Sequence, residues 1–147
     1  MSHTAEPPVV GTTDRYASTR DAVVGTLGAV LDRVPLDVPL LVLADAWSRW
    51  AARRFARRCV EPGRQVRPSD STGLETSELV RAFAIERGWR GPCYLLAGVD
   101  PLAGLRVARA FARRGPVVLC RVEPVDLDAA DDPGCVVTAE VVSGSRS

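Results

Sequence analysis

Three short apolar runs alternate along this sequence with longer segments that have helical periodicity. The runs cover residues 40–45, 93–97 and 117–123. A strand that is covered on both faces, as in a parallel sheet, gives a continuous apolar run of this kind. Because parallel strands need a crossover connection, which is usually a helix, the alternation predicts an α/β fold with helices on the faces of a sheet.

The order of elements extends this prediction to the whole chain. Val9 and Val10 can form a short first strand, and residues 135–142 form a last one that follows 117–123 without an intervening helix. We therefore expect the last two strands to be an antiparallel pair at the end of a mixed five-stranded sheet. The expected helices span residues 19–33, 47–59, 74 or 76 to 87, and 100–114.

The length of 147 residues suits one domain. We expect a single layered domain at residues 15–142, between a flexible N-terminus at 1–14 and a flexible tail at 143–147. The segment 61–73 is rich in turn-forming residues and is expected to be a loop.

Two residue types that carry much of enzyme chemistry are absent or nearly so. All 19 basic residues are arginine, which excludes Schiff-base and P-loop lysine mechanisms. The single histidine is His3, near the N-terminus, so neither a histidine base nor a histidine metal ligand is expected. No two cysteines have CxxC spacing, and we expect no metal and no cofactor. The cysteines are Cys59, Cys93, Cys120 and Cys135.

Charge and hydropathy exclude two further classes of function. The net charge of +1 gives no general case for binding nucleic acid or an anionic membrane. The N-terminus is polar, without the apolar stretch of a signal peptide, and no apolar run approaches the ~20 residues that a membrane span needs. We therefore expect a cytoplasmic protein with reduced thiols that binds neither nucleic acid nor membrane.

A more specific pattern lies in the middle of the chain. Its segments are AIERGWRGP (84–92), CYLLA (93–97), GVDPLAGL (98–105), ARAFARRG (108–115) and VVLC (117–120). Together they resemble the N-terminal half of the thiolase superfamily, which includes the β-ketoacyl synthases (ketosynthases). In that family the nucleophilic cysteine lies at the start of a long buried helix. The resemblance implies a thiolase-like half domain with a mixed sheet and an antiparallel final strand.

This sequence departs from the family at the residues that perform the reaction. Asp100 occupies the position of the family's cysteine, and Cys93 lies at the start of the preceding strand. The family's second half, with its His, Asn or Lys residues, has no counterpart in this sequence. A Claisen condensation needs a thiolate and groups that stabilise the carbanion and the oxyanion. We therefore expect no condensing activity from this chain alone.

Asp100 and Cys93 remain the candidates for catalysis. Asp100 can act as an acid or base in the family's active-site position. However, Asp followed by Pro is also a favoured N-cap and N1 pair, and the helix dipole would make this carboxylate a weak base. Cys93 is either a displaced nucleophile or a packed strand residue, because no histidine accompanies it.

Two charged segments are candidates for binding. The helix expected at 47–59 carries five arginines, which either dock an acidic partner such as an acyl carrier protein or form a solvated helix face. The segment 125–134 carries four aspartates without EF-hand spacing and is expected to be a solvated loop. The arginines are Arg49, Arg53, Arg54, Arg57 and Arg58.

The helix expected at 100–114 is apolar over most of its circumference, so it should be covered on more than one side. In the two-half family, the other half provides that cover. We therefore expect a homodimer or a complex with a ketosynthase-like subunit. The predicted interface residues are Leu102, Leu105, Ala108 and Phe111.

The leading interpretation is a truncated, non-condensing ketosynthase-like accessory protein of bacterial polyketide or fatty-acid-like biosynthesis. It would bind a synthase subunit or an acyl carrier protein. One alternative is a small enzyme that acts on carrier- or CoA-bound acyl thioesters through Asp100 or Cys93. A second alternative is an unrelated flavodoxin-like binding module, which the strand order would distinguish from a thiolase-like half.

Overall fold

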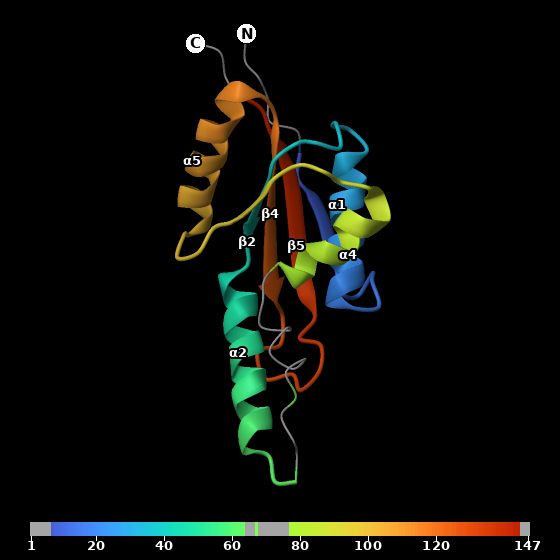
Figure 1. Cartoon of the computed structure of the whole chain (residues 1–147), viewed down its shortest axis with the longest axis vertical. Helices are drawn as coiled ribbons and strands as arrows, with labels where there is room; N and C mark the ends of the chain where they lie inside the picture. The colour runs from blue at the N-terminus through green and yellow to red at the C-terminus, as the bar shows by residue number, and fades with distance from the viewer. Residues whose placement is uncertain (1–6, 64–66, 68–76, 145–147) are drawn as a thin grey trace.

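The computed structural model describes residues 7–63, 67 and 77–144, and it places one five-stranded sheet between helices (Figure 1). Residues 1–6 and 145–147 of the expected flexible ends, and most of the expected loop and helix start between 64 and 76, lie outside the described residues. The strands are β1 (Val9–Thr12), β2 (Leu40–Leu43), β3 (Cys93–Leu95), β4 (Val117–Pro124) and β5 (Cys135–Val142). The helices are α1 (Thr19–Leu31), α2 (Asp45–Val60), α4 (Glu78–Arg87) and α5 (Pro101–Phe111), which a 3-10 turn at Ala112–Arg114 follows.

The strand order in the sheet is β1-β5-β4-β2-β3. β2 is parallel to both β3 and β4, whereas β5 is antiparallel to both β4 and β1. The predicted α/β class, the mixed five-stranded sheet and the antiparallel final strand are therefore confirmed. The expectation that the β4–β5 pair ends the sheet is wrong, because β1 pairs with the outer edge of β5, with Val9 opposite Ala139.

Local capping fixes where the helices begin. Ser18 accepts a hydrogen bond from the backbone N–H of Asp21 (3.1 Å) and so caps α1, as its side chain predicts. α2 begins at Asp45, earlier than the expected residue 47, and its first-turn carboxylate suits the positive end of the helix dipole. No helix within the described parts of the chain has the length and apolar character that a membrane crossing requires.

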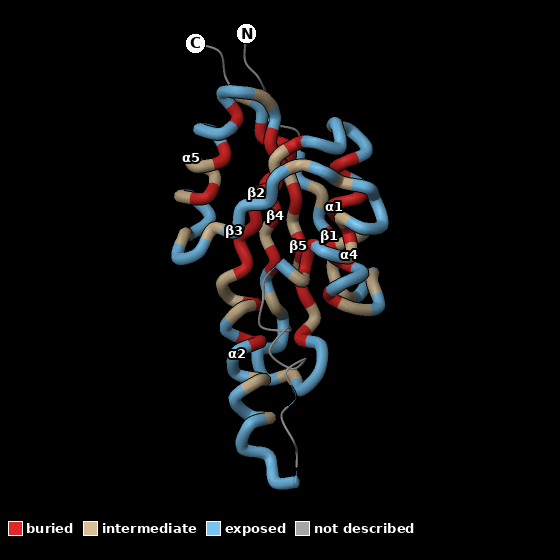
Figure 2. Tube along the Cα trace, in the orientation of Figure 1, coloured by how far each residue is buried: buried red, intermediate tan, exposed pale blue. Residues whose placement is uncertain are grey.

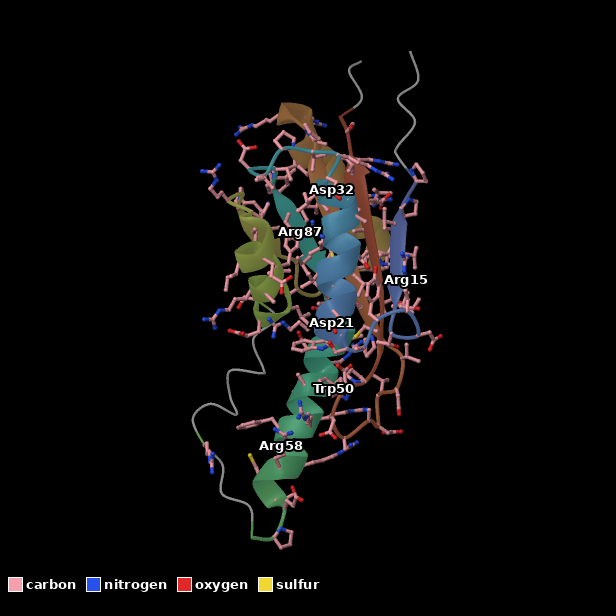
Figure 3. All side chains as sticks on the ribbon, turned by 90° about the vertical axis from the view of Figure 1, so that its right-hand side faces the viewer. Arg15, Asp21, Asp32, Trp50, Arg58 and Arg87 are labelled. Atoms are coloured by element: carbon pink, nitrogen blue, oxygen red, sulfur yellow. The ribbon has the colours of Figure 1, made fainter. Side chains whose placement is uncertain are left out.

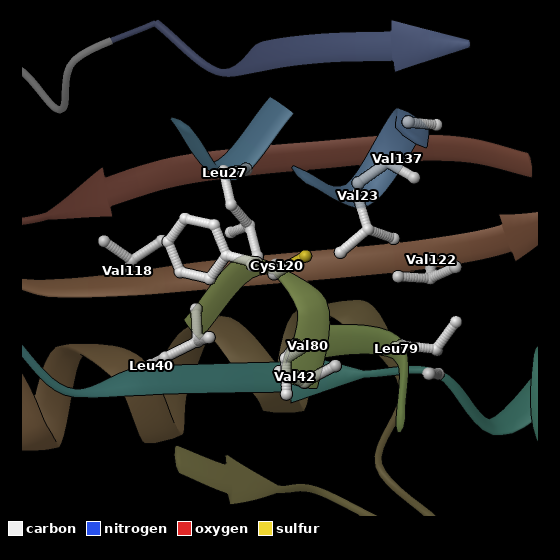
Figure 4. Packing of buried hydrophobic residues seen from close by; sticks show 14 of the residues in the cluster. Val23, Leu27, Leu40, Val42, Leu79, Val80, Val118, Cys120, Val122 and Val137 are labelled. Carbon is white, nitrogen blue, oxygen red and sulfur yellow. The ribbon is translucent and has the colours of Figure 1, made fainter. Parts of the chain in front are cut away.

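The larger core lies between the sheet and the pair α1 and α4. Val118, Cys120 and Val122 of β4 point into it (Figure 4). Phe83 of α4 belongs to the same core and is fully buried. The first turns of α2 join this core through Trp47 and Trp50. The rest of α2 extends beyond the sheet, and Figure 2 shows that this part is largely exposed.

The smaller core lies between the opposite face of the sheet and α5. Leu41 and Leu119 of the sheet contact this helix through Ala108, which is fully buried. Ala108 therefore faces its own sheet, and its assignment to a surface for another chain is wrong. Gly104 permits the close approach, because a Cβ at this position would lie 2.6 Å from Leu43 Cδ1.

Removal of the central aromatic ring should destabilise the fold strongly. We expect Phe83→Ala to lower the free energy of unfolding by about 3–5 kcal/mol, because Phe83 is fully buried and its loss leaves a cavity. Ile85→Ala on the same helix is the control, because Ile85 is exposed, and its change should stay within about 0.5 kcal/mol. Urea unfolding of both variants measures the difference. Equal losses would contradict this placement of α4.

Candidate functional site

The turn between β3 and α5 is the position at which the thiolase resemblance places a nucleophile. Gly98 adopts a left-handed conformation (φ 68°), and its N–H donates to Asp45 Oδ2 at 2.7 Å. Asp100 Oδ1 accepts a hydrogen bond from the N–H of Ala103 at 2.8 Å, and Pro101 begins the helix. The exposed Asp100 is thus the N-cap of α5, which is the structural one of its two predicted roles.

Cys93 lies at the opposite end of β3 from Asp100, so the two candidate residues do not form one site. Cys93 is an exposed residue rather than a packed one, yet partial burial of its thiol raises its pKa. The raised pKa keeps the thiol protonated at neutral pH, where a nucleophile would need to be a thiolate. Burial, with a smaller contribution from Cys93, raises the pKa of Cys120 to about 12.

The five arginines of α2 do not share one surface. Arg49 and Arg53 are exposed to solvent, whereas Arg54 and Arg58 are half-buried. Arg57 donates to the carbonyl oxygen of Asp128 at 3.3 Å and lies 3.6 Å from its carboxylate. The predicted partner surface is therefore divided into a solvent side, a side against the acidic loop, and a side that faces α4.

The acidic loop between β4 and β5 contacts α2 and α1. The Trp50 indole N–H donates to the carbonyl of Ala129 at 3.1 Å, and Arg54 lies 3.9 Å from the Asp131 carboxylate. Asp132 accepts hydrogen bonds from the backbone N–H (2.9 Å) and the hydroxyl (2.5 Å) of Thr19, the first residue of α1. The loop therefore positions α1 and α2 as well as being partly solvated.

A groove of about 580 Å³ lies between α2 and α4. The sequence did not predict this groove, although Trp47 and Trp50, three residues apart, lie on one face of a helix. The groove combines aromatic, aliphatic and charged side chains from segments far apart in the sequence. This α2–α4 groove is lined by Trp47, Trp50, Ala51, Arg54, Phe55 and Arg58 of α2, by Glu78, Leu79, Arg81, Ala82 and Ile85 of α4, and by Thr19, Arg20, Asp131, Asp132 and Pro133.

No metal-binding group of three or more His, Cys, Asp or Glu side chains is present among residues 7–63, 67 and 77–144. The four aspartates of the acidic loop instead make contacts of other kinds. Asp126 accepts from the N–H of Asp128 at 3.0 Å within the loop, and Asp132 also accepts from the N–H of Gly134 at 3.0 Å.

Comparison with solved structures identifies the fold. A chain in the structure of a ketosynthase (ApeO) in complex with its chain length factor (ApeC), from Xenorhabdus doucetiae, superposes with a TM-score of 0.69 and 13% sequence identity. This chain has a thiolase-like fold. The match covers 88% of this chain but 58% of the other, so the present chain corresponds to part of that protein. No family model matches the sequence, and no curated protein matches it significantly.

The comparison also bears on the turn that contains Asp100. It confirms that residues 98–105 form a turn and helix start after a parallel strand, as the resemblance implied. At the position where the resemblance places the family's cysteine, this chain has the capping carboxylate of Asp100. A thiolate nucleophile has no equivalent at this turn.

The capping role of Asp100 has a measurable consequence. We expect Asp100→Ala to lower the free energy of unfolding by about 1 kcal/mol, because the N–H of Ala103 loses its acceptor. Asp100→Asn keeps an acceptor oxygen, so it should lower the free energy of unfolding by only roughly 0.3 kcal/mol. Denaturant unfolding of both variants measures the difference. If both variants were destabilised equally, the capping role would be wrong.

Cys93 should be a slow nucleophile. In a Cys59→Ser variant, which leaves Cys93 as the exposed cysteine of the described residues, iodoacetamide should alkylate it more slowly at neutral pH than it alkylates N-acetylcysteine. Because burial raises its pKa above the ordinary 9.0, the rate should rise with pH and reach its midpoint above that value. Mass spectrometry of the labelled peptide measures the rate. A rate faster than that of N-acetylcysteine would indicate an activated thiolate instead.

Proposed function

We propose that this chain is a non-condensing, ketosynthase-like accessory protein that binds a synthase subunit through β3 and the outer side of α5. The proposal is supported by one observation above all, an exposed apolar surface at the edge of the sheet. This β3–α5 surface consists of Tyr94 and Leu95 of β3, exposed by 42% and 43%, and Leu102 and Phe111 of α5, exposed by 60% and 38%.

The edge strand supplies directional contacts as well as apolar area. β3 pairs with β2 on one side, and no other strand of the described residues pairs with its free side. An unpaired edge presents backbone N–H and C=O groups that another strand can bind, and exposed apolar residues on it favour association. Tyr94 contacts Phe111, with ring centroids 5.0 Å apart, so the edge strand and the helix are joined on the α5 face of the sheet, whereas Leu95 points to the opposite face.

The chemistry of the turn supports an accessory role rather than a catalytic one. Asp100 is engaged in capping, and Cys93 is held as a thiol at the far end of β3. The exposed apolar residues of β3 and α5 would give a chain without a nucleophile a surface at which a synthase subunit can bind. We therefore assign its place to polyketide or fatty-acid-like biosynthesis, as the non-condensing member of a complex.

An acyl carrier protein is a further proposed partner. Fewer arginines of α2 are available to it than the sequence suggested. Arg54 and Arg57 contact the chain's own acidic loop, so a carrier protein would meet chiefly Arg49 and Arg53. Two exposed guanidinium groups give weak, salt-dependent binding to an acidic surface. The subunit contact at β3 and α5 therefore carries the proposal.

Sedimentation velocity tests the subunit contact. We expect the chain, at micromolar concentration, to form a dimer or a defined complex with a purified ketosynthase subunit of the same organism. Tyr94→Asp should weaken this association by roughly tenfold or more, because a charge replaces a central aromatic contact. Leu127→Asp is the matched control, because Leu127 is similarly exposed in the distant acidic loop. A monomer that binds none of the organism's ketosynthase subunits would overturn the proposal.

A further inference from the structure

The α2–α4 groove and the β3–α5 surface lie on different sides of the molecule. α4 and α1 cover one face of the sheet and α5 covers the other (Figure 1). The groove volume of about 580 Å³ lies within the roughly 300–1,000 Å³ range that is typical of small-molecule sites. A ligand could therefore occupy it without competing for the proposed subunit contact.

The inner wall of the groove is aromatic and held in place. The rings of Trp47 and Trp50 lie with centroids 6.1 Å apart and tilted by 45°. The hydrogen bond from the Trp50 indole to the carbonyl of Ala129 fixes that ring against the acidic loop. Leu79 and Ile85 of α4 also line the groove. Indole rings together with aliphatic side chains are suited to a flat or slender apolar group.

The charged groups around this wall favour an anion. Four guanidinium groups and three carboxylates line the groove, which leaves one positive charge in excess. All three carboxylates have partners within the chain: Glu78 lies 3.4 Å from Arg81, Asp131 lies 3.9 Å from Arg54, and Asp132 accepts from Thr19. Arg54 lies over the Trp50 ring at 5.5 Å, which places a positive charge beside the aromatic wall.

The direction of the two nearby helices adds to this positive potential. α1 begins at Thr19 and α4 at Glu78, and both residues line the groove. The N-terminus of a helix carries a partial positive charge. Asp132 accepts from the first N–H of α1 and Glu78 lies in the first turn of α4, so these carboxylates offset part of that charge. Arg54 and Arg58 are one turn apart on the side of α2 that faces α4, and Figure 3 shows Trp50 and Arg58 along this helix.

We propose that the α2–α4 groove binds a small carboxylate with an aromatic or acyl body. The apolar body lies against Trp47 and Trp50, and the carboxylate lies toward the guanidinium groups of Arg54 and Arg58. A planar carboxylate matches the fork of N–H donors that an arginine presents. Binding is driven by the apolar contact, and the charge determines which apolar molecules are accepted.

2-Naphthoate is a suitable probe, and 2-naphthamide is its neutral counterpart of the same shape. We expect one saturable site for 2-naphthoate by titration calorimetry of the full chain, and at least about tenfold weaker binding of the amide, since a charge-assisted hydrogen bond is about twice as strong as a neutral one. Equal affinity for the two probes, or no saturable binding of 2-naphthoate, would overturn the proposal.

Two arginine variants on α2 separate a local contact from general electrostatics. Arg58→Gln should weaken 2-naphthoate binding severalfold, whereas Arg53→Gln should leave it unchanged, because Arg53 is exposed on the solvent side of the same helix. Both substitutions remove one positive charge. Equal weakening by the two variants would contradict the assigned geometry.

The tryptophans provide a second readout that does not depend on any variant. The chain has three, and Trp89 lies away from the groove, where its indole donates to the carbonyl of Val38. In NMR spectra of ¹⁵N-labelled protein, 2-naphthoate should shift the indole N–H signals of Trp47 and Trp50 and leave that of Trp89 in place. A shift of Trp89 alone would place the ligand elsewhere and refute the groove. Neither measurement involves a partner subunit, so this result is independent of the proposed subunit contact.

Discussion

β4 is the element on which both cores depend, because it is hydrogen-bonded along both edges and covered on both faces. It pairs with β2 on one side and with β5 on the other. Val118, Cys120 and Val122 point toward α1 and α4, while Val117 and Leu119 point toward α5. Because side chains alternate along a strand, a slip of one residue would exchange the two sets and empty both cores of their partners.

The sequence was sufficient for most of the sheet because its signals there are local. Continuous apolar runs identified β2, β3 and β4, and the pair of Asp100 and Pro101 identified the start of α5. It placed β1 less well, since Val9 and Val10 give only a short signal and their partner β5 lies at the other end of the chain. Periodicity also misplaced Ala108, because a helix that is apolar nearly all round does not reveal which side faces the sheet.

The candidate sites were harder to predict, because they are formed by contacts between segments that are far apart in the sequence. The five arginines of α2 look alike in the sequence, but only the folded structure shows that Arg54 and Arg57 contact the acidic loop. The groove requires α2, α4, the start of α1 and the residues around Asp131 to meet. By contrast, the sequence alone showed Asp100 at the position where the resemblance places the family's cysteine, and the hydrogen bond that its carboxylate accepts from the N–H of Ala103 shows its capping role.

The pairing of β1 with β5 joins the first strand of the chain to the last. During synthesis, β1 leaves the ribosome long before its only partner among the described strands exists, so it stays unpaired until β5 has been made. The hydrogen bonds from Thr19 to Asp132 impose the same delay on the start of α1. Contacts this distant in sequence slow folding. The protein therefore closes its sheet only as β5 arrives, and a chain that stops before Cys135 would leave β1 with no strand to join.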